Sequence, residues 1–201
     1  LVTEPDLHSG EEVRKFGEEL QMILRYLGIS DADMQKGQMR VEVNMSLRKP
    51  GGELGVKVEL KNINSFRYAA QAVDYEIKRQ SGLLNEGKKV IQETRGWDEI
   101  EQKTFSQRTK EEAQDYRYFP EPDLPPINTK DLNIDEIKAM LVELPQQRRE
   151  RFKKLYNLPD HDIEVLTGNK QLGDYFEKVV SELKEWDRLS HLKKPPKEHE
   201  E

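Results

Sequence analysis

In residues 39–48, Met39-Arg40-Val41-Glu42-Val43-Asn44-Met45-Ser46-Leu47-Arg48, apolar and polar residues alternate without a break. Successive side chains of a β-strand point to opposite faces, so this pattern predicts a strand with one buried face. Residues 56–61, Val-Lys-Val-Glu-Leu-Lys, alternate in the same way, and Lys49-Pro50-Gly51-Gly52-Glu53 has the composition of a turn. The sequence therefore predicts a β-hairpin over residues 39–64.

The polar face of this hairpin combines two carboxylates with cations and amides. It carries Arg40, Glu42, Asn44, Ser46, Arg48, Lys57, Glu59 and Lys61. Mg²⁺ binds one or two carboxylates and completes its shell with water and phosphate oxygens. Glu42 and Glu59, flanked by cations, would therefore suit a nucleotide triphosphate with its metal. A cross-strand salt-bridge ladder on a solvated face is the alternative, and the pattern leaves both open.

The segments around the hairpin predict two helices and a second pair of strands. Ser9, followed by two glutamates, is typical of a helix start, and helical spacing of apolar residues continues to Gly28. Ser65 is expected to cap a second helix, whose buried face would hold Tyr68, Ala69, Ala72, Val73, Glu76 and Ile77. Strands are expected over 89–97 and 104–108. This order predicts an α+β fold with an antiparallel sheet and helices on one face.

The second half of the chain differs from the first in its residue pattern. Residues 115–126 hold four prolines, which fix φ and remove donors, so an ordered extended loop is expected there. Helical patterns follow over 134–144, 145–155, 160–167 and 170–189. We expect a first domain over 1–127, an all-helical domain over 128–190 and a disordered tail over 191–201.

Two further segments have a functional and a structural interpretation. The N-terminus of the helix after Lys61-Asn62-Ile63-Asn64-Ser65 would suit a phosphate, but these residues are also ordinary turn and cap residues. Arg95 and Arg108 would suit bidentate phosphate contacts, or a structural salt bridge with Trp97 packed in the core.

The segment Gln146–Lys154 predicts a strongly basic helix that includes Arg148, Arg149 and Arg151. Such a helix could meet an RNA backbone. Charge runs on helices are more often solvated faces, so the pattern alone favours the structural interpretation.

The overall composition excludes several classes of function. The 201 residues carry 33 Lys and Arg against 39 Asp and Glu, for a net charge of −6, which argues against nonspecific DNA binding by the whole surface. The absence of cysteine excludes disulfides, thiolate zinc sites and a cysteine nucleophile, and it is consistent with a cytoplasmic protein. No apolar run reaches membrane-spanning length, so no membrane association is expected.

Several strings of the chain resemble one enzyme family, the B subunit of the aspartyl/glutamyl-tRNA amidotransferase. They occur in the family's order: residues 3–6 (Thr-Glu-Pro-Asp), 40–48, 59–66 (Glu-Leu-Lys-Asn-Ile-Asn-Ser-Phe), 92–95 (Gln-Glu-Thr-Arg) and 115–123 (Asp-Tyr-Arg-Tyr-Phe-Pro-Glu-Pro-Asp). Two of these strings are long and unusual, and the resemblance extends to about residue 180.

The resemblance implies a carbon–nitrogen ligase of three different polypeptides. The B subunit would bind ATP and Mg²⁺ and phosphorylate the side-chain carboxylate of Glu or Asp misattached to tRNA(Gln) or tRNA(Asn). The A subunit would release ammonia from glutamine, and the C subunit would complete the complex. The first domain would correspond to the family's cradle domain and the second to its helical, tRNA-contacting domain, which strengthens the RNA interpretation of the basic helix.

The resemblance also implies roles for individual residues. Glu59 would be the catalytic carboxylate near the metal, and Glu42 stands where the family usually has Asp. The same polar surface would include Lys61 as a catalytic residue and Arg40, Asn44 and Asn64 as nucleotide contacts. Arg95 would contact phosphate, while Arg117 and the arginines of the basic helix would contact tRNA.

The chain also departs from the family pattern. The family has a large N-terminal portion with a His and further Glu residues of the metal site, and a C-terminal tail domain, and neither matches this sequence. We therefore expect the isolated chain to hold half a site and to lack turnover. Two alternatives remain at this stage: a module that binds tRNA and the A subunit without chemistry, and a structural α+β domain with a solvated polar face.

Overall fold

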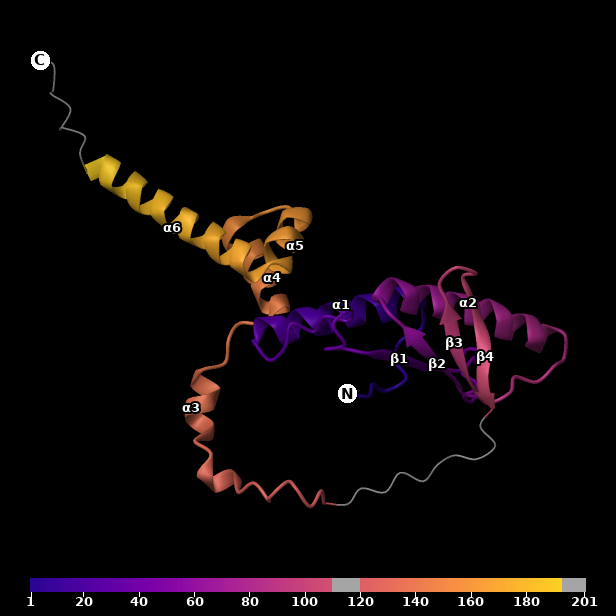
Figure 1. Cartoon of the computed structure of the whole chain (residues 1–201). Helices are drawn as coiled ribbons and strands as arrows, with labels where there is room; N and C mark the ends of the chain where they lie inside the picture. Colours follow the sequence, from indigo (N-terminus) through magenta and orange to yellow (C-terminus); the bar gives the residue numbers. More distant parts are fainter. Residues whose placement is uncertain (110–119, 193–201) are drawn as a thin grey trace, which may run out of the picture. The chain divides into compact units, whose positions relative to one another are not determined.

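A computed structural model describes residues 1–109 and 120–192 of the chain, which divides into two compact units, Leu1–Leu141 and Val142–Glu201. The first unit contains a four-stranded sheet and helices, and the second contains helices (Figure 1). The α+β class predicted from the sequence is thereby confirmed.

The first unit follows the predicted order of helix, hairpin, helix, hairpin. Its elements are α1 (Gly10–Tyr26), β1 (Val41–Met45), β2 (Val58–Ile63), α2 (Phe66–Asn85), β3 (Glu93–Asp98) and β4 (Lys103–Thr109), followed by the short helices η1 (Thr129–Asp131) and α3 (Ile134–Ala139). Between Lys49 and Gly52 the predicted turn is present, with Gly52 N–H donating to the Lys49 carbonyl at 2.9 Å.

Both long helices of this unit begin where their cap residues predict. The Ser9 hydroxyl accepts from Glu12 N–H at 3.2 Å, and the Ser65 hydroxyl accepts from Tyr68 N–H at 3.1 Å. Each bond satisfies a backbone donor that has no partner inside the helix. Gly28 follows α1 with a φ of 67°, a left-handed conformation that glycine adopts at little cost.

The sheet has the order β1-β2-β3-β4, and its pairing differs from the sequence prediction in one respect. The outer pairs, β1–β2 and β3–β4, are antiparallel, but β2 and β3 are parallel. The prediction of a wholly antiparallel sheet is therefore wrong at the central pair. The cause is α2, which carries the chain back along the sheet, so that β3 starts from the same end as β2.

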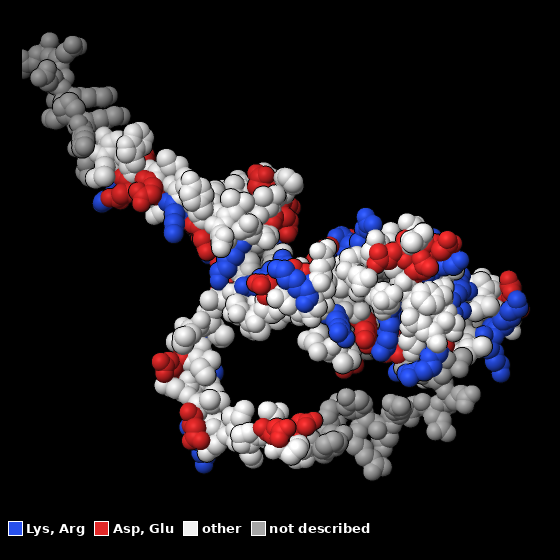
Figure 2. Space-filling view, viewed as in Figure 1, with Lys and Arg blue, Asp and Glu red and all other residues white. Residues whose placement is uncertain are grey.

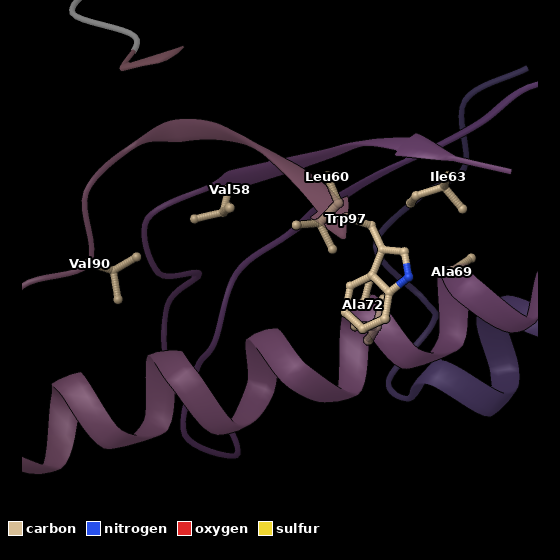
Figure 3. Packing of buried hydrophobic residues seen from close by; sticks show 8 residues of the cluster. Val58, Leu60, Ile63, Ala69, Ala72, Val90 and Trp97 are labelled. Carbon is tan, nitrogen blue, oxygen red and sulfur yellow. The ribbon is translucent and has the colours of Figure 1, made fainter. Parts of the chain in front are cut away.

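The core of the first unit lies between α2 and one face of the sheet (Figure 3). Val58, Leu60 and Ile63 of β2 face Ala69 and Ala72 of α2, and all five are buried. Val73 of α2, Val90 and Trp97 of β3 complete the cluster. Burying a large apolar side chain contributes about 1.5–3 kcal/mol, so this contact fixes which face of the sheet meets the helix.

The second unit is built from α4 (Pro145–Tyr156), α5 (Asp160–Gly168) and α6 (Lys170–Leu192), which confirms the helices predicted over 145–155, 160–167 and 170–189. Phe152 of α4 is fully buried, with its ring centroid 5.4 Å from that of Tyr156 and 5.7 Å from that of Phe176. Pro145 occupies the first turn of α4, where its missing N–H has no cost.

Residues 120–142 contain no buried side chain. The compact units divide after Leu141, beyond the boundary near 127 expected from the prolines, and that expectation stays a prediction about the family's domains. The helix expected over 134–144 ends at Ala139. Of the expected loop, residues 115–119 lie outside the described residues, as do residues 193–201 of the expected tail.

Across the two described ranges of the chain, no helix has both the length and the apolar character needed to cross a bilayer.

Two helical glycines of the first unit provide a matched test of this packing. A Cβ on buried Gly10 would lie 2.4 Å from the Ala70 backbone oxygen, whereas a Cβ on exposed Gly82 would meet nothing within 4 Å. We expect Gly10→Ala to lower the free energy of unfolding by about 1–3 kcal/mol. Gly82→Ala should raise it by about 0.5–1 kcal/mol, because alanine favours helix. Urea unfolding measures both, and equal effects would contradict the close approach of α1 to α2.

Candidate functional site

The face of the sheet opposite α2 carries four of the predicted polar residues, Glu42, Asn44, Glu59 and Lys61. Because Val58 and Leu60 point toward α2, strand alternation places Glu59 and Lys61 on the other side. Asn44 of β1 and Thr94 of β3 are the register partners of Glu59 on its two neighbouring strands. We call this surface, formed by Glu42, Asn44, Glu59, Lys61 and Thr94, the open face.

Two carboxylates of the open face converge on one cation. The Lys61 Nζ lies 3.6 Å from Glu42 Oε1 and 3.5 Å from Glu59 Oε1. Glu42 and Lys61 are half-exposed, whereas the Glu59 side chain is only 13% exposed. Its second oxygen, Oε2, accepts a hydrogen bond from the Thr94 hydroxyl at 2.8 Å. The carboxylate of Glu59 is thus held on both oxygens, while the carboxylate of Glu42 and the ammonium of Lys61 reach solvent.

This arrangement supplies two of the oxygen ligands that Mg²⁺ uses. Within residues 1–109 and 120–192, no group of three His, Asp or Glu side chains is arranged to hold a metal ion. Mg²⁺ is often bound by one or two carboxylates with phosphate and water filling the other positions, so Glu59 and Glu42 fit such an ion. The Lys61 ammonium already shows that a cation is held between them.

A β-bulge in β2 shapes the open face, and the sequence analysis missed it. The register shifts between Val41, opposite Ile63, and Val43, opposite Leu60. Asn62 is the extra residue, with a φ of 59°, a left-handed conformation that asparagine tolerates better than most residues. The bulge returns Ile63 to the core while Lys61 stays on the open face. The sequence signal for this bulge is Asn62, an asparagine that follows the alternating residues of the strand.

The structure does not gather all the predicted nucleotide contacts around Glu59. Asn44 lies beside Glu59 in the register, but the Asn64 amide donates to Glu99 Oε1 at 2.9 Å, toward the β3–β4 turn. Arg40 is exposed and precedes β1. The hairpin strands are shorter than the alternation suggested, and Arg48 and Lys57 lie outside them.

Arg95 lies on the face of the sheet that meets α2, away from Glu59. Its guanidinium contacts Glu93 Oε1 at 2.6 Å and Glu76 Oε1 at 3.0 Å, and it donates to the Thr104 hydroxyl at 2.9 Å. The structural interpretation of Arg95, with Trp97 packed in the core, is the one that the geometry supports. The reason is the strand period: residues 93, 95 and 97 share the helix face, and residue 94 faces the other way.

Arg95 belongs to a polar cluster between α2, β3 and β4 that is buried at its centre and reaches solvent at Ser106; we call it the buried cluster. Its members are Glu76, Arg79, Gln80, Glu93, Arg95, Thr104 and Ser106. Glu76, fully buried, accepts from Arg79 at 2.7 Å, from Gln80 at 2.9 Å and from Thr104 at 2.5 Å. Burial alone would raise the pKa of Glu76, but the hydrogen bonds from Arg79, Thr104 and Gln80 outweigh it and lower that pKa. The sequence placed Glu76 on the buried helix face without indicating its partners.

The arginines of α4 are bound within the second unit. Arg148 is buried, and its guanidinium lies 2.6 Å from Asp174 and 2.9 Å from Glu177 of α6. Arg151 pairs with Glu143 at 2.6 Å and also with Glu177, and its hydrogen bond lowers the pKa of Glu177.

Arg149 contacts Glu164 at 3.0 Å. On the visible surface of the protein, basic and acidic side chains are mixed (Figure 2). The arginines of the predicted basic RNA surface on α4 are therefore paired with acids from α5, from α6 and from the segment before α4. Arg117, the remaining predicted tRNA contact, lies outside the described residues.

Comparison with known proteins agrees with the resemblance in the sequence. A family model described as the GatB/GatE catalytic domain matches residues 1–135, which hold the sheet and the open face. The chain belongs to this family. It is also similar over 181 residues to the B subunit of the aspartyl/glutamyl-tRNA(Asn/Gln) amidotransferase of Caldicellulosiruptor saccharolyticus, with 53% identity. The corresponding proteins of Persephonella marina and Brachyspira hyodysenteriae are 52% and 51% identical over 182 and 180 residues.

These matches cover 89–90% of this chain but only 37–38% of each relative. The chain therefore spans well under half the length of the curated relatives that it matches. Membership of the family applies to the part compared, and the activity of a whole relative requires a separate proposal.

The buried cluster predicts a stability effect with a defined pH dependence. Glu76→Gln removes the fully buried carboxylate and leaves Glu93 as the remaining carboxylate for both Arg79 and Arg95, so the free energy of unfolding should fall by about 3 kcal/mol at neutral pH. The pKa of Glu76 is lower in the fold than its ordinary value of 4.5, so its stabilisation is full above that value and is lost as pH falls through the lowered pKa.

Urea unfolding at several pH values from neutral to acidic tests both effects of Glu76→Gln. The variant should lose less stability than the wild type on acidification. Glu101→Gln, at an exposed acid paired with Lys103, is the matched control and should behave like the wild type. An identical acid response of all three proteins would refute the role of Glu76.

Another prediction concerns Arg148, whose ion pairs with Asp174 and Glu177 connect α4 to α6. Arg148→Ala leaves Asp174 and Glu177 without this partner and should destabilise the second unit by about 3 kcal/mol. Lys154→Ala, at an exposed position of the same helix, should not. Hydrogen exchange of α6 measures the difference. If Arg148→Ala weakens tRNA binding while α6 exchanges as in the wild type, Arg148 is an RNA contact after all.

Proposed function

We propose that this chain carries part of the phosphorylating site of a tRNA-dependent amidotransferase. The substrates are ATP and Glu-tRNA(Gln) or Asp-tRNA(Asn), in which the amino acid is attached to the wrong tRNA. The observation that carries the proposal is the convergence of Glu42 and Glu59 on Lys61 on the open face of a domain of the GatB/GatE family. A solvated ladder explains the Lys61 pairs, but it does not require Glu59 to be nearly buried and held on both oxygens.

The reaction is an acyl activation followed by an amide formation. The side-chain carboxylate of the misattached Glu or Asp attacks the γ-phosphorus of ATP, and the bond to the bridging oxygen breaks, releasing ADP. Ammonia then attacks the activated carbonyl carbon and phosphate leaves, giving the amide. The attacking carboxylate is ionised at neutral pH, so the first step needs no general base. What it needs is alignment and neutralisation of negative charge.

The residues of the open face have the chemistry for these tasks. Mg²⁺, held by Glu59 with Glu42 beside it, would neutralise charge on the phosphates when bound. Lys61 is half-exposed and contacts both acids at 3.5–3.6 Å, so its ammonium can turn toward a phosphate oxygen without leaving a buried site. Asn44, next to Glu59 in the register, offers a neutral donor at the same surface.

The rest of the enzyme would be supplied by other subunits and by the part of the B subunit that this chain does not span. The relatives are named as B subunits, and we propose that the A and C subunits complete the complex, with the A subunit releasing ammonia from glutamine. The chain spans about 38% of its relatives, so further ligands for Mg²⁺ and ATP would come from the rest of the B subunit. The isolated chain should therefore show no turnover.

The alternative is a module that binds tRNA and the A subunit without chemistry of its own, since the chain is only part of its relatives' length. The arginines of α4, which would be its tRNA contacts, are paired with acids of the same unit, and this weakens the RNA-binding part of that alternative.

The decisive experiment uses Glu59→Gln in a full-length B subunit reconstituted with its A and C partners. Transamidation of Glu-tRNA(Gln) and release of the γ-phosphate are followed separately, and tRNA binding is measured by filter retention. The substitution removes the carboxylate charge but keeps the side chain's length, so both activities should fall by about 100-fold or more while tRNA binding is retained.

Glu86→Gln is the matched control, because Glu86 is exposed and pairs only locally with Lys88 among its described contacts. It should leave both activities unchanged. Wild-type transamidation by Glu59→Gln would overturn the proposed site, and the open face would then be ordinary surface or a tRNA contact.

A further inference from the structure

Thr94 is the residue that joins the open face to the buried cluster on the other side of the sheet. Its hydroxyl donates to Glu59 Oε2 at 2.8 Å, and it is only 5% exposed. The two residues are register partners on the parallel strands β2 and β3, so the backbone bonds of the sheet set the distance between them. The hydroxyl thus meets the Glu59 carboxylate from one fixed direction.

The neighbours of Thr94 are anchored from the opposite face. Glu93 and Arg95 point toward α2, where Arg95 contacts Glu76 at 3.0 Å and bridges to Glu93 at 2.6 Å. Ser106 of β4 donates to the other oxygen of Glu93, and Thr104 of β4 donates to Glu76. Three consecutive residues of β3 therefore have two side chains locked to α2 and β4 and one directed at Glu59.

We propose that Thr94 is the positioning residue for the Glu59 carboxylate, and that the buried cluster around Glu76 holds Thr94 in place through β3. This inference rests on the proposed function of the open face. It assigns the Thr94 hydroxyl, rather than its methyl group, as the part that matters. With one oxygen held by Thr94, Glu59 presents the other toward Lys61 and toward whatever cation replaces it.

Two substitutions at Thr94 separate positioning from packing. Thr94→Val keeps the shape but removes the hydroxyl, and Thr94→Ser keeps the hydroxyl but removes the methyl group. A positioning role predicts that transamidation kcat falls roughly 10- to 100-fold in Thr94→Val with the tRNA KM unchanged, and that Thr94→Ser stays within about threefold of wild type. A packing role predicts the reverse order.

The experiment uses the full-length B subunit with its partners and includes Glu59→Gln and a control, Thr129→Val, at an exposed threonine of η1. A crystal structure of Thr94→Val provides a readout besides activity, and there Glu59 should have left its position between Thr94 and Lys61. In the Glu59→Gln background, adding Thr94→Val should cause less loss than it does alone, because both changes act on one contact.

The outcomes separate the two proposals. Wild-type kcat in Thr94→Val, or a Glu59 carboxylate that stays in place while Thr94→Val loses activity, overturns the positioning role. If Glu59→Gln is inactive in that same series, the proposed function survives. Full activity of Glu59→Gln overturns the proposed function, and with it the catalytic meaning of the Thr94 contact.

Discussion

The packing of α2 on one face of the sheet is the contact on which the rest of the first unit depends. Leu60 and Trp97 from the sheet meet Ala69 and Ala72 of the helix, and all four are buried. A strand has two faces, so each apolar residue that this contact buries assigns its neighbours to the opposite face. Glu59 and Lys61 reach the open face for that reason. A slip of β2 by one residue would bury both charges and expose Leu60.

The contact between α2 and the sheet changes character along the helix. In its first half, α2 meets β2 through small apolar residues, and in its second half it meets β3 and β4 through Glu76 and Arg79. Replacing such an ionic cluster by apolar residues is often neutral or stabilising in other proteins, so stability alone does not explain it. Directional hydrogen bonds do fix the position of β3 along α2. A fixed position of β3 also fixes Thr94, whose hydroxyl donates to Glu59 on the open face.

In the second unit, ion pairs connect the helices to one another. Arg148 and Arg151 of α4 bridge to acids of α6, and the Phe152 ring lies beneath both guanidinium groups at 5.1 and 5.2 Å. A basic run in a sequence has the same appearance whether its partners are phosphates or carboxylates. Here the partners on α6 are 26 to 29 residues further along the chain, so only the folded helices reveal them.

Elements that depend on neighbouring residues could be predicted from the amino-acid sequence. Ser9 and Ser65 set the starts of α1 and α2, and alternation set the two faces of β1 and β2, because capping and strand period act over a few residues. It also placed Glu42, Glu59 and Lys61 on one surface, and its strings identified the family.

Long-range packing set the direction of β3 beside β2, the bulge at Asn62 and the partners of Arg95, Arg148 and Thr94. Each of these is a contact between residues far apart in the chain, or a departure from strand period, and alternation has the same appearance in parallel and antiparallel strands. Pairing direction depends on the path of the connecting helix across the sheet, and charge partners depend on which helices pack together. The local sequence pattern contains neither the pairing direction nor the charge partners, because both depend on how apolar surface is buried over the whole unit.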